Sequence, residues 1–349
     1  MNYKEFVEQV KAELPDKLPE NLSGASITEN TVEKLQGQSY EGITVKPQDS
    51  SIGITMNMEP YFQQAQAGVP MEQIVQNIAD RGGAAFEERP EVSVNELMDY
   101  EAMKPKLIIR LVGTEGNQEM LQTVPHKEME DMSIVYRLNM GESAEGRASI
   151  LVNNQMMEQY GITPEQLHQD AMEQSVKEQP IVIKNITAIL NEMGVMPELI
   201  EEDSPMYVAS NESRLQGAGV IAYPDFMDTA AEQLHGDFYV LPSSVHEVIL
   251  LKDDGGMDAE MLKAMVSDVN SNEVEREDQL TDNAYHYDNE AKLFEKADVY
   301  QERKSKERSM AYGAEDRPSV LDTLKEKTKD CMERGIKEPH APRREEFAL

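Results

Sequence analysis

The sequence is poor in several residue types on which whole classes of protein depend. Its 349 residues include one cysteine, Cys331, no tryptophan, and only 6% aromatic residues. A lone cysteine cannot form a disulfide within the chain, and it excludes zinc sites built from several cysteines. These absences exclude a disulfide-stabilised scaffold and favour a reducing compartment.

Long hydrophobic runs are absent too. No stretch approaches the roughly 18 apolar residues that a transmembrane helix needs. The first residues, MNYKEFVEQVKAEL, lack the apolar core of a secretory signal. We therefore expect a cytoplasmic protein that has no membrane partner.

Basic residues are scarce, and the charge is unevenly distributed. The formal net charge is −33, from 33 basic and 66 acidic residues. Residues 289–349 hold 14 residues of each sign, so residues 1–288 hold the other 52 acidic and 19 basic ones. An acidic body repels phosphates, so direct binding to nucleic acid is not expected. The same acidity promotes solubility, and it would also attract a basic protein partner.

Methionine, by contrast, is abundant, with 22 copies. Its flexible side chain fills irregular gaps in a core, and it also builds adaptable apolar binding surfaces. The sequence alone is compatible with both uses.

The hydrophobic periodicity changes repeatedly between helical and strand-like along the chain. Apolar residues recur at helical spacing over residues 1–14, and Thr163, Pro164 and Gln166 have the pattern of a helix start. Strands are predicted at 40–47, 51–56, 106–113, 133–140 and 147–154. Because strict βαβ alternation is missing, we predict an α+β fold, with a mixed sheet or sheets and packed helices.

We predict two subregions followed by a tail. An acidic linker at 198–205 separates an N-terminal α+β region, 1–197, from a C-terminal α+β region, 206–296. Whether the two regions share one core stays open. Residues 297–349 are highly charged and are expected to be partly disordered, with a short helix near Ser319–Leu324.

The stretch HGDFYVLPSSVHEVILL, residues 235–251, has the polar residues of an enzyme site between apolar runs. We predict a β-hairpin instead, because Pro and Ser form turns and strands so close together normally pair. The G-x-S-x-G elbow of hydrolases is missing, and the metalloprotease motif H-E-x-x-H fails at Leu250. As a candidate surface site the stretch offers Asp237, Tyr239, Ser243, Ser244, His246 and Glu247.

Other motifs are weaker. GAGVIA, residues 217–222, matches G-x-G-x-x-A, but its apolar residues predict a strand where a dinucleotide fingerprint needs the start of a helix. KDDGG, residues 252–256, predicts a turn that leads into a helix rather than a calcium loop. No two of the six histidines have the spacing of a helical ligand pair, although a metal site assembled from distant segments stays open. We therefore assign no catalytic residue, cofactor-binding residue or metal ligand.

Several segments together resemble a known family. They include ITVKPQDSSIGITMNMEPYFQQAQAGVPMEQIVQNIAD, PHKEMEDMSIVYRL, MMEQYGITPEQLHQDA and GDFYVLPSSVHEVILL. In this order they resemble the family catalogued as domain of unknown function 5688, over residues 1 to about 295. The resemblance implies a bacterial cytoplasmic protein of Firmicutes, often encoded near mobile elements. It supplies no reaction, cofactor or catalytic residue.

The sequence therefore favours a non-enzymatic accessory or interaction protein that offers an acidic, methionine-rich surface to a protein partner. Two alternatives stay open. One is a hydrolase that uses His246 with Ser243 or Ser244. The other is an acidic DNA mimic that inhibits a DNA-binding enzyme, since the charge total permits it.

Overall fold

The structure is a computed structural model that describes residues 1–48, 50, 53–89, 93–143, 146–194, 204–242 and 244–315. The chain divides into two compact units, Met1–Ala297 and Asp298–Leu349. Within the described residues the strands form three sheets, and every pairing is antiparallel. The α+β prediction is confirmed, with antiparallel sheets where a mixed sheet was suggested. The boundary at 198–205 stays a prediction, and most of that segment lies outside the described residues.

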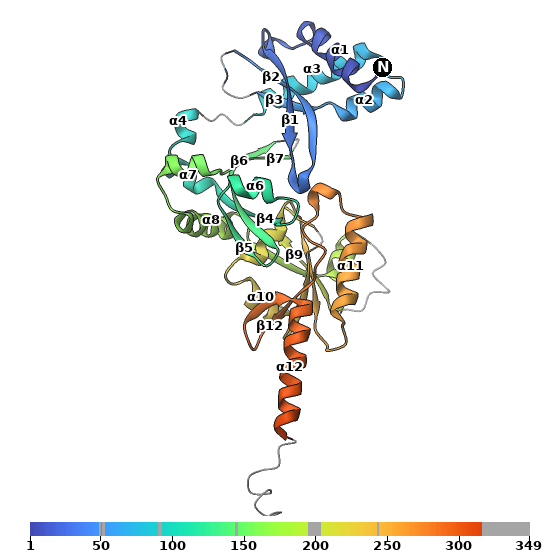
Figure 1. Ribbon diagram of the computed structural model, residues 1–349. Coiled ribbons are helices and arrows are strands. Elements are labelled where there is room, and N and C mark those ends of the chain that lie inside the picture. The colour runs from blue at the N-terminus through green and yellow to red at the C-terminus, as the bar shows by residue number, and fades with distance from the viewer. Residues whose placement is uncertain are drawn as a thin grey trace, which may run out of the picture. The chain divides into compact units, whose positions relative to one another are not determined.

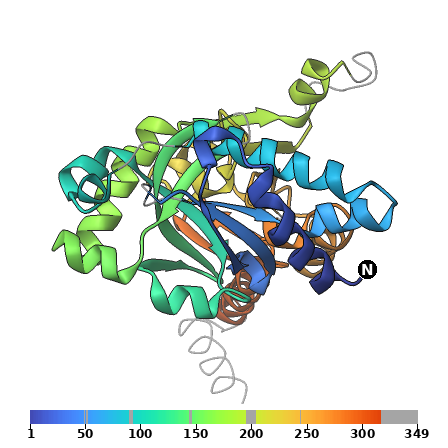
Figure 2. The same cartoon turned by 90° about the horizontal axis from the view of Figure 1, so that it is seen from above.

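The N-terminal part of the first unit is a three-stranded sheet with helices packed against it (Figure 1 and Figure 2). Its apolar core joins side chains of the helices, such as Phe6 and Ile78, to Ile43 and Val45 of the sheet. Its elements are α1 (Tyr3–Glu13), β1 (Ser26–Glu33), β2 (Ser39–Lys46), β3 (Ile54–Asn57), α2 (Glu59–Gln66) and α3 (Met71–Glu87). Strand β1 was not predicted, because its sequence SITENTVE is mostly polar. It forms nevertheless by pairing along its whole length with β2.

A four-stranded sheet follows, in which β6 pairs with β4, β5 and β7. Helix α8 lies against it, and the Ser175 hydroxyl accepts a hydrogen bond from the Ile109 N–H at 2.8 Å. The predicted helix start is confirmed, since the Thr163 side chain caps Gln166. The elements here are α4 (Val94–Leu97), α5 (Tyr100–Met103), β4 (Leu107–Gly113), α6 (Gln118–Thr123), β5 (His126–Met129), β6 (Met132–Ser143), β7 (Gly146–Leu151), α7 (Asn154–Tyr160) and α8 (Pro164–Glu178).

The third sheet has six strands in the order β13-β12-β10-β11-β9-β8. The predicted hairpin is confirmed, because β10 and β11 pair from Phe238 opposite Lys252 to Leu241 opposite Ile249. The elements of this part are β8 (Ile181–Asn185), α9 (Ile186–Glu192), β9 (Met206–Asn211), α10 (Phe226–Leu234), β10 (Phe238–Leu241), β11 (Val248–Lys252), α11 (Ala259–Asn272), β12 (Tyr285–Asp288) and β13 (Leu293–Lys296).

The strand predicted at residues 217–222 is wrong. Gly217–Ala222 forms a 3-10 helix, and its five residues from Gly217 to Ile221 are all buried. The Gly217 N–H donates to the His246 carbonyl at 3.0 Å, and the Ala218 N–H donates to the Val245 carbonyl at 3.1 Å. A short apolar segment is easily predicted as a strand from its sequence. Here the backbone N–H groups of the segment instead donate hydrogen bonds to carbonyl groups of the neighbouring loop.

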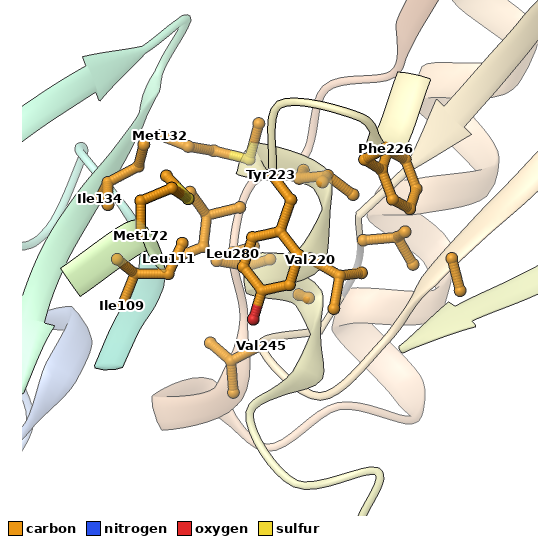
Figure 3. Packing of buried hydrophobic residues seen from close by; sticks show 14 of the residues in the cluster. Ile109, Leu111, Met132, Ile134, Met172, Val220, Tyr223, Phe226, Val245 and Leu280 are labelled. Atoms are coloured by element: carbon orange, nitrogen blue, oxygen red, sulfur yellow. The ribbon is translucent and has the colours of Figure 1, made fainter. Parts of the chain in front are cut away.

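The largest described core draws on both sides of residues 198–205. Ile109, Leu111, Met132 and Ile134 of the four-stranded sheet face Val220, Tyr223 and Phe226 of the later segment, with Val245 and Leu280 alongside (Figure 3). The question that the sequence left open is thereby answered for part of the first region: residues 103–172 share one core with residues 209–287, whereas the N-terminal part has a core of its own.

A smaller apolar cluster lies on the other face of the six-stranded sheet, where α11 packs on β10 and β11. Its members include Tyr239, Leu251, Leu262 and Val266. In the residues described, the second unit consists of helix α12 (Ala297–Glu315) from Asp298 onward, and ion pairs such as Arg303 with Glu307 connect its successive turns. The short tail helix predicted near Ser319–Leu324 lies outside the described residues.

Candidate functional site

The residues singled out in HGDFYVLPSSVHEVILL separate into two places. Ser244, His246 and Glu247 lie in the loop between β10 and β11, and Ser243 of this loop lies outside the described residues. Val245 points into the main core and is 2% exposed. Ser244 forms an isolated bridge with Gln279. The loop is therefore anchored on both sides rather than projecting as a free tip.

His246 is held by its surroundings through both ring nitrogens. Nδ1 accepts a hydrogen bond from the Gln216 N–H at 3.1 Å, and Nε2 lies 3.4 Å from the Asp278 carboxylate. In the neutral imidazole the acceptor Nδ1 leaves the proton on Nε2, where it faces Asp278.

Ser244 does not act on the imidazole. Its hydroxyl accepts a hydrogen bond from the backbone N–H of His246 at 3.0 Å. A nucleophilic serine needs its base beside the hydroxyl, and the described residues contain no hydrogen bond between the Ser244 hydroxyl and this ring. Glu247 is half-buried. The geometry of this loop supports a structural role for Ser244 and His246.

Asp237 and Tyr239 lie elsewhere, at the start of β10. Tyr239 is buried, and its ring meets the His286 ring edge-on with centroids 4.8 Å apart. Asp237, Asp253 and His286 each offer a ligand atom, and these atoms lie within 4.8 Å of one another. We call these three residues the acid–histidine cluster.

The strand register explains why the acid–histidine cluster forms. Tyr239 pairs with His286 and with Leu251, so β10 lies between β12 and β11. Alternate residues of a strand share a face, which places Asp237 beside Tyr239 and Asp253 beside Leu251 on the face that carries His286. The cluster therefore comes from three strands or strand ends brought together only by folding.

Two more acidic side chains are buried on this face. Glu295 pairs directly with His286 across β12 and β13, and it is 7% exposed. Asp288, two residues after His286, is 1% exposed, and its Oδ1 accepts the N–H groups of Glu290 and Ala291. Burying carboxylates is costly unless hydrogen bonds or positive charge compensate, and this face of the sheet brings several of them together.

Sequence reasoning missed Asp253 and His286 as partners of Asp237. Asp253 had been assigned only to a turn, which it does form: its Oδ1 accepts the Gly255 N–H at 2.8 Å. The available signal was that Asp237 and Asp253 lie at the two ends of the predicted hairpin. Without the order of the strands in the sheet, that signal does not bring the three together.

A polar cleft of about 710 Å³ lies near the end of α11. Its lining includes Asp131, Lys263, Asn270, Arg276 and Gln279. The Asp131 carboxylate accepts hydrogen bonds from Thr281 at 2.9 Å, from Asn283 at 2.7 Å and from the Tyr285 hydroxyl.

The pKa of Asp131 follows from these contacts. Burial alone would raise it, but hydrogen bonds from Tyr285, Asn283 and Thr281 outweigh burial and hold the pKa below its ordinary value. Burial and the bond to Asp131 raise the pKa of Tyr285 above its ordinary range. Asp131 thus stays ionised and ties the turn between β5 and β6 to β12.

Helix α11 presents a second apolar face to solvent. Its inner face buries Ala259, Leu262 and Val266. On its outer side Met261 is 58% exposed, Met265 44% and Val269 37%. We call Met261, Met265 and Val269 the α11 apolar row, since their spacing of four residues aligns them along the helix.

The surroundings of this row are acidic. Residues 253–278, which include α11, contain nine acidic and two basic residues. No helix among the described residues is both long and apolar enough to cross a membrane. The α11 apolar row therefore lies in a segment of strongly negative charge.

Comparison with curated proteins and with solved structures finds no match. A family model does match, over residues 3–289, and its description is a family of unknown function, DUF5688. The match spans the acid–histidine cluster, the loop around His246 and the α11 apolar row. The chain therefore belongs to the family of unknown function DUF5688.

Proposed function

We propose that this chain is a cytoplasmic accessory protein that binds a basic protein partner through the outer face of α11. The observation that carries the proposal is the α11 apolar row, Met261, Met265 and Val269, exposed within an acidic segment. The accessory role near bacterial mobile elements, which the resemblance implies, is part of the same proposal.

Methionine suits the centre of such a contact. Its unbranched, polarisable side chain adapts to differently shaped apolar partners. Met261 and Met265 also lie on the outer side of a helix whose inner side already fills a core, so their exposure is not required by the packing of the fold. Exposed apolar side chains that gather in this way typically mark interaction sites.

Acidic residues on and just before α11 favour a partner of opposite charge. Glu260 and Asp268 lie on α11 itself, and Asp254 and Asp258 come just before it. A partner with lysine or arginine around an apolar centre would gain attraction in the encounter and in orientation. The proposed occupant is thus the basic, amphipathic segment of another protein.

A synthetic amphipathic helix of Leu and Lys, labelled with a fluorophore, tests the surface directly. Fluorescence anisotropy should show binding to the full chain, weakening as salt rises. Replacing both Met261 and Met265 by Ser should weaken binding by about a hundredfold, because burying each side chain contributes on the order of 1.5 kcal/mol.

The matched control replaces two exposed methionines outside α11, Met98 and Met193, which are 42% and 68% exposed. Their double Ser variant should bind the peptide like the unmodified chain. A helix of Leu and Glu should not bind. Equal weakening by both double variants, or binding that ignores salt, would overturn the proposed surface.

A further inference from the structure

The acid–histidine cluster, Asp237, Asp253 and His286, has the chemistry of a metal site. It combines two carboxylates with one imidazole, and their ligand atoms lie within 4.8 Å of one another. Among the described residues this is the one group of its kind. From these residues we infer that the chain binds one divalent first-row transition-metal ion, such as Zn²⁺ or Mn²⁺, on the α11 face of its six-stranded sheet.

The distances fit shared coordination. The His286 Nε2 lies 3.0 Å from the Asp253 Oδ2. Two ligands about 2.1 Å from one ion are separated by roughly 3.0 Å at an octahedral edge and roughly 3.4 Å at a tetrahedral edge. An ion can therefore sit between these atoms with small side-chain movements.

The ligands are already oriented by the backbone. The Asp237 Oδ1 accepts the Asn289 N–H at 2.9 Å, and the Asp253 Oδ1 accepts the Gly255 N–H at 2.8 Å. The Asp253 N–H in turn donates to the Asp237 carbonyl at 3.0 Å, which couples the two strand ends. Metal ligands are typically fixed by such outer contacts, which lower the cost of organising the site.

Charge and burial favour a cation here. The side chain of His286 is 0% exposed and that of Asp253 is 9% exposed, and the buried Asp288 and Glu295 lie on the same face. Several carboxylates brought together away from water repel one another and lose hydration. A divalent ion offsets both effects.

The donor set points to the class of ion. Imidazole nitrogen suits Zn²⁺ and Fe²⁺, and the two carboxylates also suit Mn²⁺, whereas Mg²⁺ and Ca²⁺ prefer sites made of oxygen alone. Among the divalent transition ions, Zn²⁺ should bind more tightly than Mn²⁺ to the same ligands. The inference stands independently of the proposed surface on α11.

The chain contains a matched control for this site. His246 and Asp278 form a second histidine–aspartate pair, 3.4 Å apart and both 31% exposed. That pair does not belong to a group of three ligands among the described residues. Variants at both pairs change the same chemistry, and only one pair should change metal binding.

The first experiment is calorimetric titration of the full, chelator-stripped chain with ZnCl₂, and then with MnCl₂, in the presence of excess Mg²⁺ to occupy surface carboxylates. We expect one tight ion per chain. His286→Gln and Asp253→Asn should each weaken binding by at least the roughly 10- to 100-fold that loss of an outer contact costs. His246→Gln and Asp278→Asn should leave affinity and stoichiometry unchanged.

Asp237→Asn covers the case in which a buried variant fails to fold. Asp237 is half-buried, and an amide oxygen at this position can still accept the Asn289 N–H. This variant should keep the far-ultraviolet circular dichroism of the unmodified chain and lose metal affinity. Addition of Zn²⁺ should also raise the Tm of the unmodified chain and not that of Asp237→Asn, since a ligand stabilises only the state that binds it.

Three results would overturn the inference. One is an unmodified chain that takes up neither Zn²⁺ nor Mn²⁺ in a one-to-one ratio. Another is a folded Asp237→Asn chain with unchanged affinity. The third is an equal loss in His246→Gln, which would show that binding comes from acidic groups in general. After the first result, His286 and Asp253 would be described only as a buried hydrogen-bonded pair.

Discussion

Two histidine–aspartate pairs lie in the part of the chain that the structure describes, and they differ in burial more than in geometry. His286 and Asp253 are 3.0 Å apart with side chains 0% and 9% exposed, whereas His246 and Asp278 are 3.4 Å apart and 31% exposed. The attraction between opposite charges grows as water is excluded, and so does the cost of leaving either charge alone. Similar chemistry therefore has different consequences in the two places.

The location of each histidine explains the difference. His286 lies within β12, between Tyr239 of β10 and Glu295 of β13, and helix α11 packs on that face. His246 lies in a loop, where the Gln216 N–H and the Asp278 carboxylate contact its ring. The first pair belongs to the interior of the sheet, and the second fastens a loop to its neighbours.

Replacement of each histidine by alanine should give the largest difference in stability between the two pairs. In metal-free protein, His286→Ala should lower the free energy of unfolding by about 3–5 kcal/mol, because it opens a cavity and removes the partner of a buried carboxylate. His246→Ala should cost only about 1 kcal/mol, the usual net value of a partly exposed hydrogen bond. Urea unfolding followed by circular dichroism measures both.

The control is Asp278→Asn, which should cost no more than His246→Ala, because it removes a charge from a half-exposed pair. If His246→Ala cost as much as His286→Ala, burial would not be the property that distinguishes the two pairs. The loop would then contribute to the core beyond the contacts of Val245.

Two glycines of the GAGVIA segment, residues 217–222, test how closely this segment packs against the loop around His246. A Cβ at Gly217 would lie 2.1 Å from the Ser210 hydroxyl and 2.8 Å from the His246 carbonyl. A Cβ at Gly219 would meet only atoms at 3.8 Å. Gly217→Ala should therefore cost about 3 kcal/mol, and Gly219→Ala should change stability by less than about 1 kcal/mol.

Urea midpoints of these two variants, with unchanged m-values, would check the prediction. Equal costs would show that the 3-10 segment is fixed by something other than its approach to His246. The result also bears on the G-x-G-x-x-A pattern, since this structure explains the first glycine by close backbone packing and requires no nucleotide.

Much of the fold could be predicted from local patterns. The hairpin at 238–252 and the helix start at Thr163 follow from turn residues, alternation and capping. Strand β1 could not be predicted in this way, because its polar sequence is stabilised by pairing with β2 rather than by burial of its side chains. The prediction of a strand at residues 217–222 was wrong because apolar residues indicate burial and do not determine the backbone conformation.

The acid–histidine cluster shows more clearly what local sequence patterns cannot predict. Asp237 was a candidate, but Asp253 and His286 are 16 and 49 residues further along the chain. Their meeting depends on β10 lying between β11 and β12, and this strand order comes from tertiary packing. Local patterns singled out Asp237 alone, and only the topology brings Asp253 and His286 to it.

A third histidine, His168, extends the comparison, because its charged neighbour is a lysine and not an aspartate. His168 Nδ1 lies 3.0 Å from the Tyr136 hydroxyl, and its Nε2 lies 3.3 Å from the Lys127 Nζ. Burial and the Lys127 charge lower the pKa of His168 below its ordinary value of 6.5. A protonated ring would direct its Nε2–H at another positive charge.

The sign of the pH effect follows. Because the folded pKa is lower, the unfolded chain binds the proton first as pH falls below about 6.5. The unmodified chain should therefore lose stability from pH 7 to pH 5, by a small amount because the ring is partly exposed. Lys127→Gln should reduce that loss and His168→Gln should remove it, as judged from Tm at both pH values. A loss unchanged in His168→Gln would show that the lowered pKa of His168 is not the cause of the acid sensitivity.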